Sequence, residues 1–198
     1  MILDGAIKMI ERDGPASLSM RRLGSSLGVE GMAIYHHFRG RDELLAAIGD
    51  RLLEPLCELN LGNDWREACR RFATALRGIA MSRPATFQLL GLQPLNTPGA
   101  LEPVERLLGV LVGVGFTAPQ ALATYRATVS YARGYALAEA TGFTVDAAHP
   151  AGRERLAALP VAEFPILAGQ ASQLEDLDAD AAFDLGLDAL LFGLGGPG

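Results

Sequence analysis

The chain has 198 residues, 49% of them hydrophobic and 20% charged, with a net charge of −6, so it can bury a sizeable core and is not a disordered protein. Its two cysteines form no CxxC motif, which argues against a disulfide framework and favours a reduced, cytoplasmic environment. The first residues carry charges that a signal peptide lacks, and the longest apolar run, 107–116, is about half of a membrane-spanning helix, so we expect a soluble protein with no membrane partner.

The negative charge is unevenly distributed. Residues 1–51 hold seven basic and seven acidic side chains, whereas the remainder holds ten basic and sixteen acidic ones. The whole surplus therefore lies after residue 51, although a net negative chain argues at first against nucleic-acid binding. Four arginines flank the segment 28–38: Arg21, Arg22, Arg39 and Arg41. A local basic patch on an acidic protein is compatible with DNA binding, because phosphates respond to nearby charge.

Helical periodicity dominates the first 60 residues. A first helix is predicted over 2–13, with Ile2, Ala6, Met9 and Ile10 on one face and Gly14–Pro15 at its end. A second short helix begins after the N-cap Ser19, ends at Gly28 and buries Met20, Leu23 and Leu27.

A third short helix begins near Glu30 and a longer one runs from about Arg41 to Leu53. In the third helix the pattern predicts inward positions at Val29, Ala33, Ile34 and Phe38. The positions left to face outward are Gly31, Met32, Tyr35, His36 and His37. The longer helix turns Leu44, Leu45, Ile48 and Leu52 inward.

Two short helices joined by a glycine turn and followed by a longer helix are typical of a helix-turn-helix. The second short helix would enter the major groove of DNA, with basic neighbours on the phosphates. Tyr35 and His37 can donate hydrogen bonds to phosphate, while Gly31, Met32 and Ala33 form a small, mostly apolar tip for base edges such as a thymine methyl.

Two other interpretations of this segment remain open, an ordinary helical bundle and a metal site. Any small helical bundle has short helices and glycine turns. Adjacent histidines also suggest a metal site, but neighbouring side chains on a helix diverge by about 100°. Because no Cys, Asp or Glu lies one turn from both His36 and His37, no metal and no cofactor are expected.

The run SLSMRRLGSSLGVEGMAIYHHFRGRDELLAAI, residues 17–48, resembles the DNA-binding domain of the tetracycline-repressor (TetR) family of bacterial transcriptional regulators. The resemblance covers about residues 2–50 and includes Leu27-Gly28-Val29 at the turn and Arg41 opening the next helix. It implies an all-α fold, with an N-terminal three-helix helix-turn-helix domain over 1–46 and a C-terminal helical bundle for effector binding and dimerisation over 47–198.

The resemblance also implies roles for matching positions. Ser19 and Arg21 would contact phosphate or a base, and Gly31, Met32 and Ala33 would lie at base edges. The backbone contacts would come from Tyr35, His36, His37 and Arg41. Tetracycline repressors carry polar residues where this chain has Gly31 and Ala33, so hydrogen-bonded readout should be thinner and the operator different.

Beyond residue 60 the pattern predicts an all-helical body. Asp64 caps a helix to about Ser82, Pro84 opens one to Leu90, Pro98 opens one to Gly115, and Thr117 caps a long helix over 118–141. Residues 142–159 are expected to form a flexible connection with one short helical turn. The last two helices are predicted over 160–173 and 180–194.

The last helix is apolar on two sides. Phe183, Leu187, Leu190 and Leu194 share one face, and Leu185 and Phe192 lie nearly opposite. Small residues of the 118–141 helix, such as Ala132 and Gly134, permit close approach of a neighbour. Burial within a monomer is one explanation. The other, which the resemblance also implies, is a homodimer that holds two recognition helices about one turn of DNA apart.

The C-terminal part resembles the same family more weakly, through Asp64-Trp65-Arg66-Glu67, Gly115-Phe116 and Phe183 with Gly186-Leu187. In that fold an effector lies within the helical body. Candidate ligand-binding residues are Phe72, Leu76, Phe87, Gln88, Leu107, Leu111, Tyr125, Val129 and Arg133, with Tyr131, Asn96 and Arg126 as further candidates, although each of them could be ordinary core or surface.

The effector is not expected to be a magnesium–tetracycline chelate. Tetracycline repressors hold that chelate with a histidine in the middle of the domain, and this chain has none between His37 and His149. Phe72 and Leu76 are apolar where drug-contacting residues would fall. We therefore expect a largely apolar, metal-independent small molecule.

The sequence gives less support to two rival classes, an enzyme and a protein-binding adaptor. No GxSxG, Walker or HExxH motif supports an enzyme. A protein-binding helical adaptor would not need the outward arginines. The resemblance implies a regulator, a repressor before an activator, whose dimer binds a palindromic operator. An effector would shift the connecting helix, about 41–57, with a coupling of about 1–3 kcal/mol.

Overall fold

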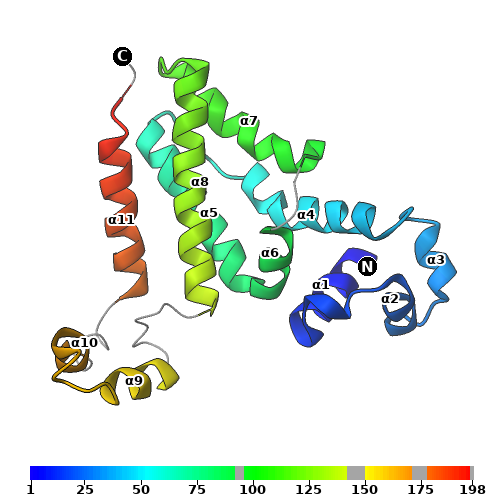
Figure 1. Cartoon of the computed structure of the whole chain (residues 1–198). Helices are drawn as coiled ribbons and strands as arrows, with labels where there is room; N and C mark the ends of the chain where they lie inside the picture. Colours follow the sequence, from blue (N-terminus) through cyan, green and yellow to red (C-terminus); the bar gives the residue numbers. More distant parts are fainter. Residues whose placement is uncertain (92–95, 142–149, 171–177, 197–198) are drawn as a thin grey trace.

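The computed structural model of the chain describes residues 1–91, 96–141, 150–170 and 178–196. Within these ranges the chain forms α-helices and one short 3-10 helix (Figure 1). Their bounds are α1 Ile2–Asp13, η1 Pro15–Ser17, α2 Met20–Ser26, α3 Gly31–Tyr35, α4 Arg41–Cys57, α5 Trp65–Ser82, α6 Pro84–Gly91, α7 Pro98–Gly113, α8 Ala118–Thr141, α9 Pro150–Ala157, α10 Pro165–Gln170 and α11 Ala179–Gly193. The predicted all-α class is confirmed, and none of the described helices is long and apolar enough to cross a membrane.

The first three helices and the start of α4 form a small bundle at one end of the molecule (Figure 1). Its core is made of fully buried aliphatic side chains: Ile10, Leu23, Ile34, Leu44 and Ile48, each at most 1% exposed. Each of these residues comes from the apolar stripe of its own helix, so amphipathic periodicity accounts for the bundle.

The helix α4 continues from this bundle into the body of the protein. Its first half buries Leu44 and Leu45 on the side of α1, and its second half buries Leu52 and Leu56 beside α5 and α7. A proline, Pro55, lies within its last turn. One continuous element therefore belongs to both packing units.

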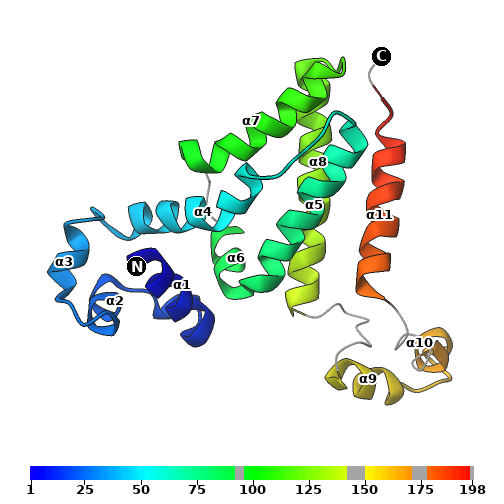
Figure 2. The same ribbon diagram turned by 180° about the vertical axis from the view of Figure 1, so that it is seen from behind.

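The body is built around α5 and α8, which lie side by side in both views (Figures 1 and 2). Aromatic pairs join them and their neighbours: Trp65 meets Phe116 edge-on at 5.1 Å, and Phe72 meets Tyr125 at 6.2 Å. The predicted N-cap of α5 is confirmed, because Asp64 accepts a hydrogen bond from the Glu67 amide at 2.8 Å. The helix α7 covers one side of this pair and α11 the other.

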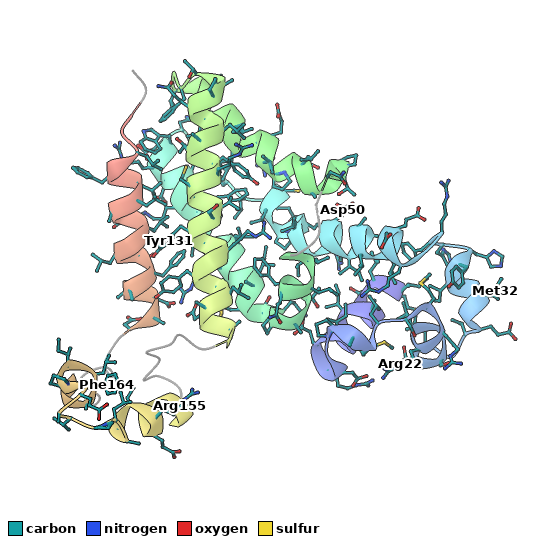
Figure 3. The ribbon with its side chains drawn as sticks, viewed as in Figure 1. Arg22, Met32, Asp50, Tyr131, Arg155 and Phe164 are labelled. Carbon is teal, nitrogen blue, oxygen red and sulfur yellow. The ribbon has the colours of Figure 1, made fainter. Side chains whose placement is uncertain are left out.

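A buried arginine fixes α5 to the C-terminal helices. Arg77 donates two hydrogen bonds to the Glu139 carboxylate, at 2.5 and 2.8 Å, and one to Asp180 at 2.7 Å. Nearby, the Tyr131 hydroxyl donates to the Phe183 carbonyl at 2.8 Å. A side chain at Gly186 would collide with this tyrosine. Figure 3 shows Tyr131 between α8 and α11.

The segment before α11 departs from the sequence prediction. The expected helix over 160–173 is confirmed only as α10, and its residues beyond 170 lie outside the described part of the chain. Residues 161–163 form a turn instead, because the proline at 165 disfavours the α conformation at Phe164 and so starts the helix there. The predicted connection at 142–149 also lies outside the described residues, and the expected single turn after it is the eight-residue helix α9.

Candidate functional site

The turn between α2 and α3 depends on small residues at a close helix contact. Ser19 caps α2 by accepting a hydrogen bond from the Arg22 amide at 3.2 Å, as predicted. Gly28 has φ 71°, which an L side chain rarely adopts. A Cβ on Gly24 would lie 2.9 Å from the Cα of Gly31, so the two helices touch backbone to backbone.

Two predicted orientations around this turn are wrong. Val29, expected inward, is 40% exposed, because it lies before the first turn of α3. Ile34 is therefore the one buried residue that anchors this helix. Gly31, expected outward, is half-buried: a Cβ there would contact the Arg21 Cα at 3.4 Å. Ala33 is also half-buried.

The outer face of α3 carries the remaining predicted residues. Met32 is 65% exposed and Tyr35 49%, and both histidines that follow are exposed. In Figure 3 Met32 lies at the end of the molecule farthest from α11. This face projects from a helix that a single buried isoleucine anchors.

The arginines around α3 differ from others in the small bundle in their ion pairing. Asp13 binds Arg12 and lies 3.8 Å from Arg22, and Asp4 lies 3.6 Å from Arg51. Among the described residues, no carboxylate forms an ion pair with Arg21, Arg39 or Arg41. These three exposed guanidinium groups are therefore available to an anionic partner.

A cavity of about 440 Å³ lies in the body, within the range of small-molecule sites. Helices α4 to α8 all contribute to it. The lining residues are Leu52, Leu53, Leu56, Phe72, Leu76, Phe87, Leu90, Gly91, Ala100, Leu101, Pro103, Val104, Leu122, Tyr125, Arg126, Val129 and Arg133.

Most of the predicted ligand-binding residues lie in this lining, and some do not. Phe72, Leu76, Phe87, Tyr125, Val129 and Arg133 line the cavity, as does Arg126. Leu107 and Leu111 are fully buried core residues outside the lining, because their faces of α7 pack against the neighbouring helices. Gln88 and Asn96 are exposed outside it, and Tyr131 is turned toward α11.

The polar groups of the cavity are concentrated on α8. Burial raises the pKa of Tyr125, and the charge of Arg133 partly offsets this rise. The Arg133 guanidinium donates a hydrogen bond to the Gly91 carbonyl, at the end of α6, at 3.1 Å. In the described ranges, no group of His, Cys, Asp and Glu side chains could hold a metal ion.

Sequence reasoning missed the α4 residues of the cavity and the contacts that hold α4 and α6. Arg106 donates to the carbonyls of Leu56, at 3.3 Å, Cys57 and Leu59, at 2.8 Å, at the C-terminal end of α4. Asp50, midway along α4, accepts a hydrogen bond from the Thr97 hydroxyl at the start of α7.

A second connection joins α1 to α6. The Glu11 carboxylate accepts hydrogen bonds from the amides of Ala85, at 3.3 Å, and Thr86, at 2.8 Å, and from the Thr86 hydroxyl at 2.6 Å. A carboxylate is a favourable cap for a helix N-terminus. Since its partners lie 74 and 75 residues away, no local pattern indicated this role.

Fold and surface together define a helix-turn-helix regulator with a ligand cavity, and the comparisons agree with that class. A family model described as bacterial regulatory proteins, tetR family, matches residues 2–48, and one described as tetracyclin repressor-like, C-terminal domain, matches residues 59–196. The chain belongs to the TetR family of transcriptional regulators.

Individual relatives support this assignment over the full length. The chain is 30% identical to an HTH-type transcriptional regulator of Saccharopolyspora erythraea, over 98% of the chain and 82% of that protein. A Streptomyces coelicolor A3(2) structure described as a possible TetR family transcriptional regulator matches with a TM-score of 0.79 and 26% identity, over 98% and 96% of the two chains. The Streptomyces coelicolor TetR family protein ActR in complex with (S)-DNPA matches with a TM-score of 0.76 and 25% identity, over 98% and 94%.

Proposed function

We propose that the chain is a homodimeric repressor that leaves a palindromic operator when a small molecule occupies the cavity. The observation that carries this proposal is the position of α4. Leu44 and Ile48 of this helix form the core of the helix-turn-helix bundle, and Leu52 and Leu56 of the same helix line the cavity. A ligand that moves the second half of α4 therefore acts on the first half.

The proposed DNA contacts follow the exposed face around α3. Met32 and Ala33, with Gly31 behind them, are assigned to base edges. Ser19 and Arg21 are assigned to a phosphate or a base, and the backbone contacts are assigned to Tyr35, His36, His37 and Arg41. Their support is the exposure of the α3 face and the lack of ion pairs, within the described ranges, at the arginines beside it.

The proposed dimer uses the outer faces of α8 and α11. Phe183 and Leu187 are buried against the body, whereas Leu185 and Phe192 on the other face of α11 are 75% and 83% exposed. A helix that is apolar on both sides favours burial on both sides. A two-fold dimer would also space two recognition helices for a two-fold operator.

The proposed boundary between the DNA-binding domain, 1–46, and the effector-binding domain, 47–198, falls within α4. Two polar contacts support transmission through that helix: Arg106 holds its C-terminal carbonyls, and Asp50 is bound to Thr97. Arg106 belongs to α7 and Thr97 is its N-cap, and α7 lines the cavity as well. The complex of the relative ActR with a small molecule supports ligand responsiveness in this fold.

The test is fluorescence anisotropy of the protein with labelled promoter DNA flanking its own gene, at several salt concentrations. Wild type should bind this duplex more tightly than random duplex, with a steep salt dependence. Tyr35→Ala and Arg41→Ala should weaken binding, and Arg41→Ala should also reduce the salt slope by about 1. Arg66→Gln, an exposed arginine of α5, is the matched control and should leave binding unchanged.

If the promoter and a wider operator selection both gave only non-specific binding, the regulator would have to be abandoned. If Arg41→Ala bound the promoter DNA as tightly as Arg66→Gln does, the assignment of Arg41 to the DNA-contacting surface around α3 would be wrong. Specific binding that no occupant of the cavity weakens would leave a DNA-binding protein without the proposed release.

A further inference from the structure

The cavity contains two arginines and no carboxylate among the residues that line it. Arg126 and Arg133 lie seven residues apart on α8, so their Cα atoms share one face about 10 Å apart. Some arginines of the body are ion-paired, for example Arg70 with Asp188 and Arg77 with Glu139. Within the described part of the chain, neither cavity arginine has an ion-pair partner.

The third polar side chain of the cavity is Tyr125, whose hydroxyl can also donate a hydrogen bond. Its ring packs edge-on against Phe72, and its hydroxyl makes no hydrogen bond to the described residues. Burial raises its pKa, so the phenol keeps its proton at neutral pH. Two guanidinium groups and one phenol thus offer donors. Among the described residues, the one hydrogen bond that any of them makes is that from Arg133 to the Gly91 carbonyl.

The remainder of the lining is apolar. Apolar residues from α4 to α8 make up this part of the lining, among them Leu76 of α5 and Phe87 of α6. Arg126 and Arg133 are exposed, so their guanidinium groups lie where the cavity opens to solvent. A neutral, wholly apolar occupant would fill the space without using these two positive charges. An occupant with an acidic oxygen group would satisfy them.

We infer that the effector is an amphipathic anion, with an apolar body among the leucines and phenylalanines and an acidic oxygen group held by Arg133, Arg126 and the Tyr125 hydroxyl. This inference rests on the proposed function, because it assigns a chemical class to the effector of that same cavity. Arg133 uses only Nη2 to bind the Gly91 carbonyl, so its other N–H groups remain available to the acidic group.

The test compares two fluorescent probes of almost the same shape, anthracene-2-carboxylate and anthracene-2-carboxamide, by direct titration. Wild type should bind the carboxylate about tenfold or more tightly than the carboxamide. In Arg133→Gln and in the double variant Arg126→Gln/Arg133→Gln this preference should shrink toward equality, with carboxamide binding retained. Arg66→Gln removes a positive charge outside the cavity and should keep the preference.

Retained carboxamide binding in the variants shows that the cavity still folds, so loss of the preference reports on charge. Equal affinity of wild type for the two probes, or no binding of either, would overturn the inference. A preference that survives in the double variant would place the anion elsewhere and overturn it too. Operator binding is measured separately without probe: a protein that binds its operator but does not discriminate the probes keeps the proposed function and loses this inference.

Discussion

The contact between Glu11 and the start of α6 predicts a specific loss of stability. Glu11→Ala removes the acceptor of two backbone amides and of the Thr86 hydroxyl. Thr86 is fully buried, so water cannot replace the lost acceptor without opening the contact between α1 and α6. The substitution thus acts on a connection between the helix-turn-helix bundle and a wall of the cavity.

The magnitude follows from two overlapping costs. Loss of a capping side chain costs about 0.5–2 kcal/mol. An unsatisfied buried donor costs about 1–3 kcal/mol. Because the same bonds enter both figures, we expect Glu11→Ala to lower the free energy of unfolding by about 3 kcal/mol. Glu11→Gln retains one acceptor oxygen for the Thr86 amide and hydroxyl, and should cost about half as much.

Urea denaturation at one fixed protein concentration measures these differences. Glu30→Ala is the control, because Glu30 is an exposed acid of the same bundle whose side chain does not cap α3. Hydrogen exchange should show faster exchange of the Ala85 and Thr86 amides in Glu11→Ala. A loss below about 0.5 kcal/mol, equal to that of the control, would refute the reasoning, since exposed sites without such contacts fall in that range.

Two further predictions concern the body. Arg77→Met should lower the free energy of unfolding by about 3–5 kcal/mol, because it leaves the largely buried Glu139 without its partner. Arg77→Lys should recover only part of this stability, since lysine cannot form two parallel hydrogen bonds to the carboxylate. A thermal melt of either variant that matched wild type would contradict the prediction. Burial raises the pKa of the Cys69 thiol from 9.0 to about 11. The unfolded thiol therefore ionises first, and stability present below pH 9 should fall by up to about 1.4 kcal/mol per pH unit between 9 and 11. Cys69→Ala, unfolded in urea across the same pH range, should lack this component of the fall; an identical pH profile would contradict the assignment.

Local patterns predicted the helices well because their signals are contained in a few neighbouring residues. Ser19 and Asp64 are N-caps, and the long helix over 118–141 has the predicted bounds. The α3 face was predicted in part: Met32 and Tyr35 are exposed, whereas Gly31 is half-buried at a helix contact that only the packed structure creates.

The cavity shows where sequence reasoning stops. Periodicity marks an apolar face but does not distinguish a face that lines empty space from one that fills the core, so Leu107 and Phe72 looked equivalent. Long-range polar contacts leave no local signal either. Arg106 binds carbonyls of residues 56, 57 and 59, and nothing around position 106 indicates those partners.

The sharing of α4 between bundle and cavity has a consequence for engineering this protein as a biosensor. Substitutions at Leu52, Leu53 or Leu56, chosen to admit a new inducer, alter a helix whose other half supports the proposed DNA-contacting face. They should therefore change background expression together with inducer preference. Wall positions on α8, such as Leu122, belong to a helix that packs mainly on α5, α7 and α11 and not on α4. Libraries built there should shift inducer preference while leaving the uninduced signal of the reporter near its starting level.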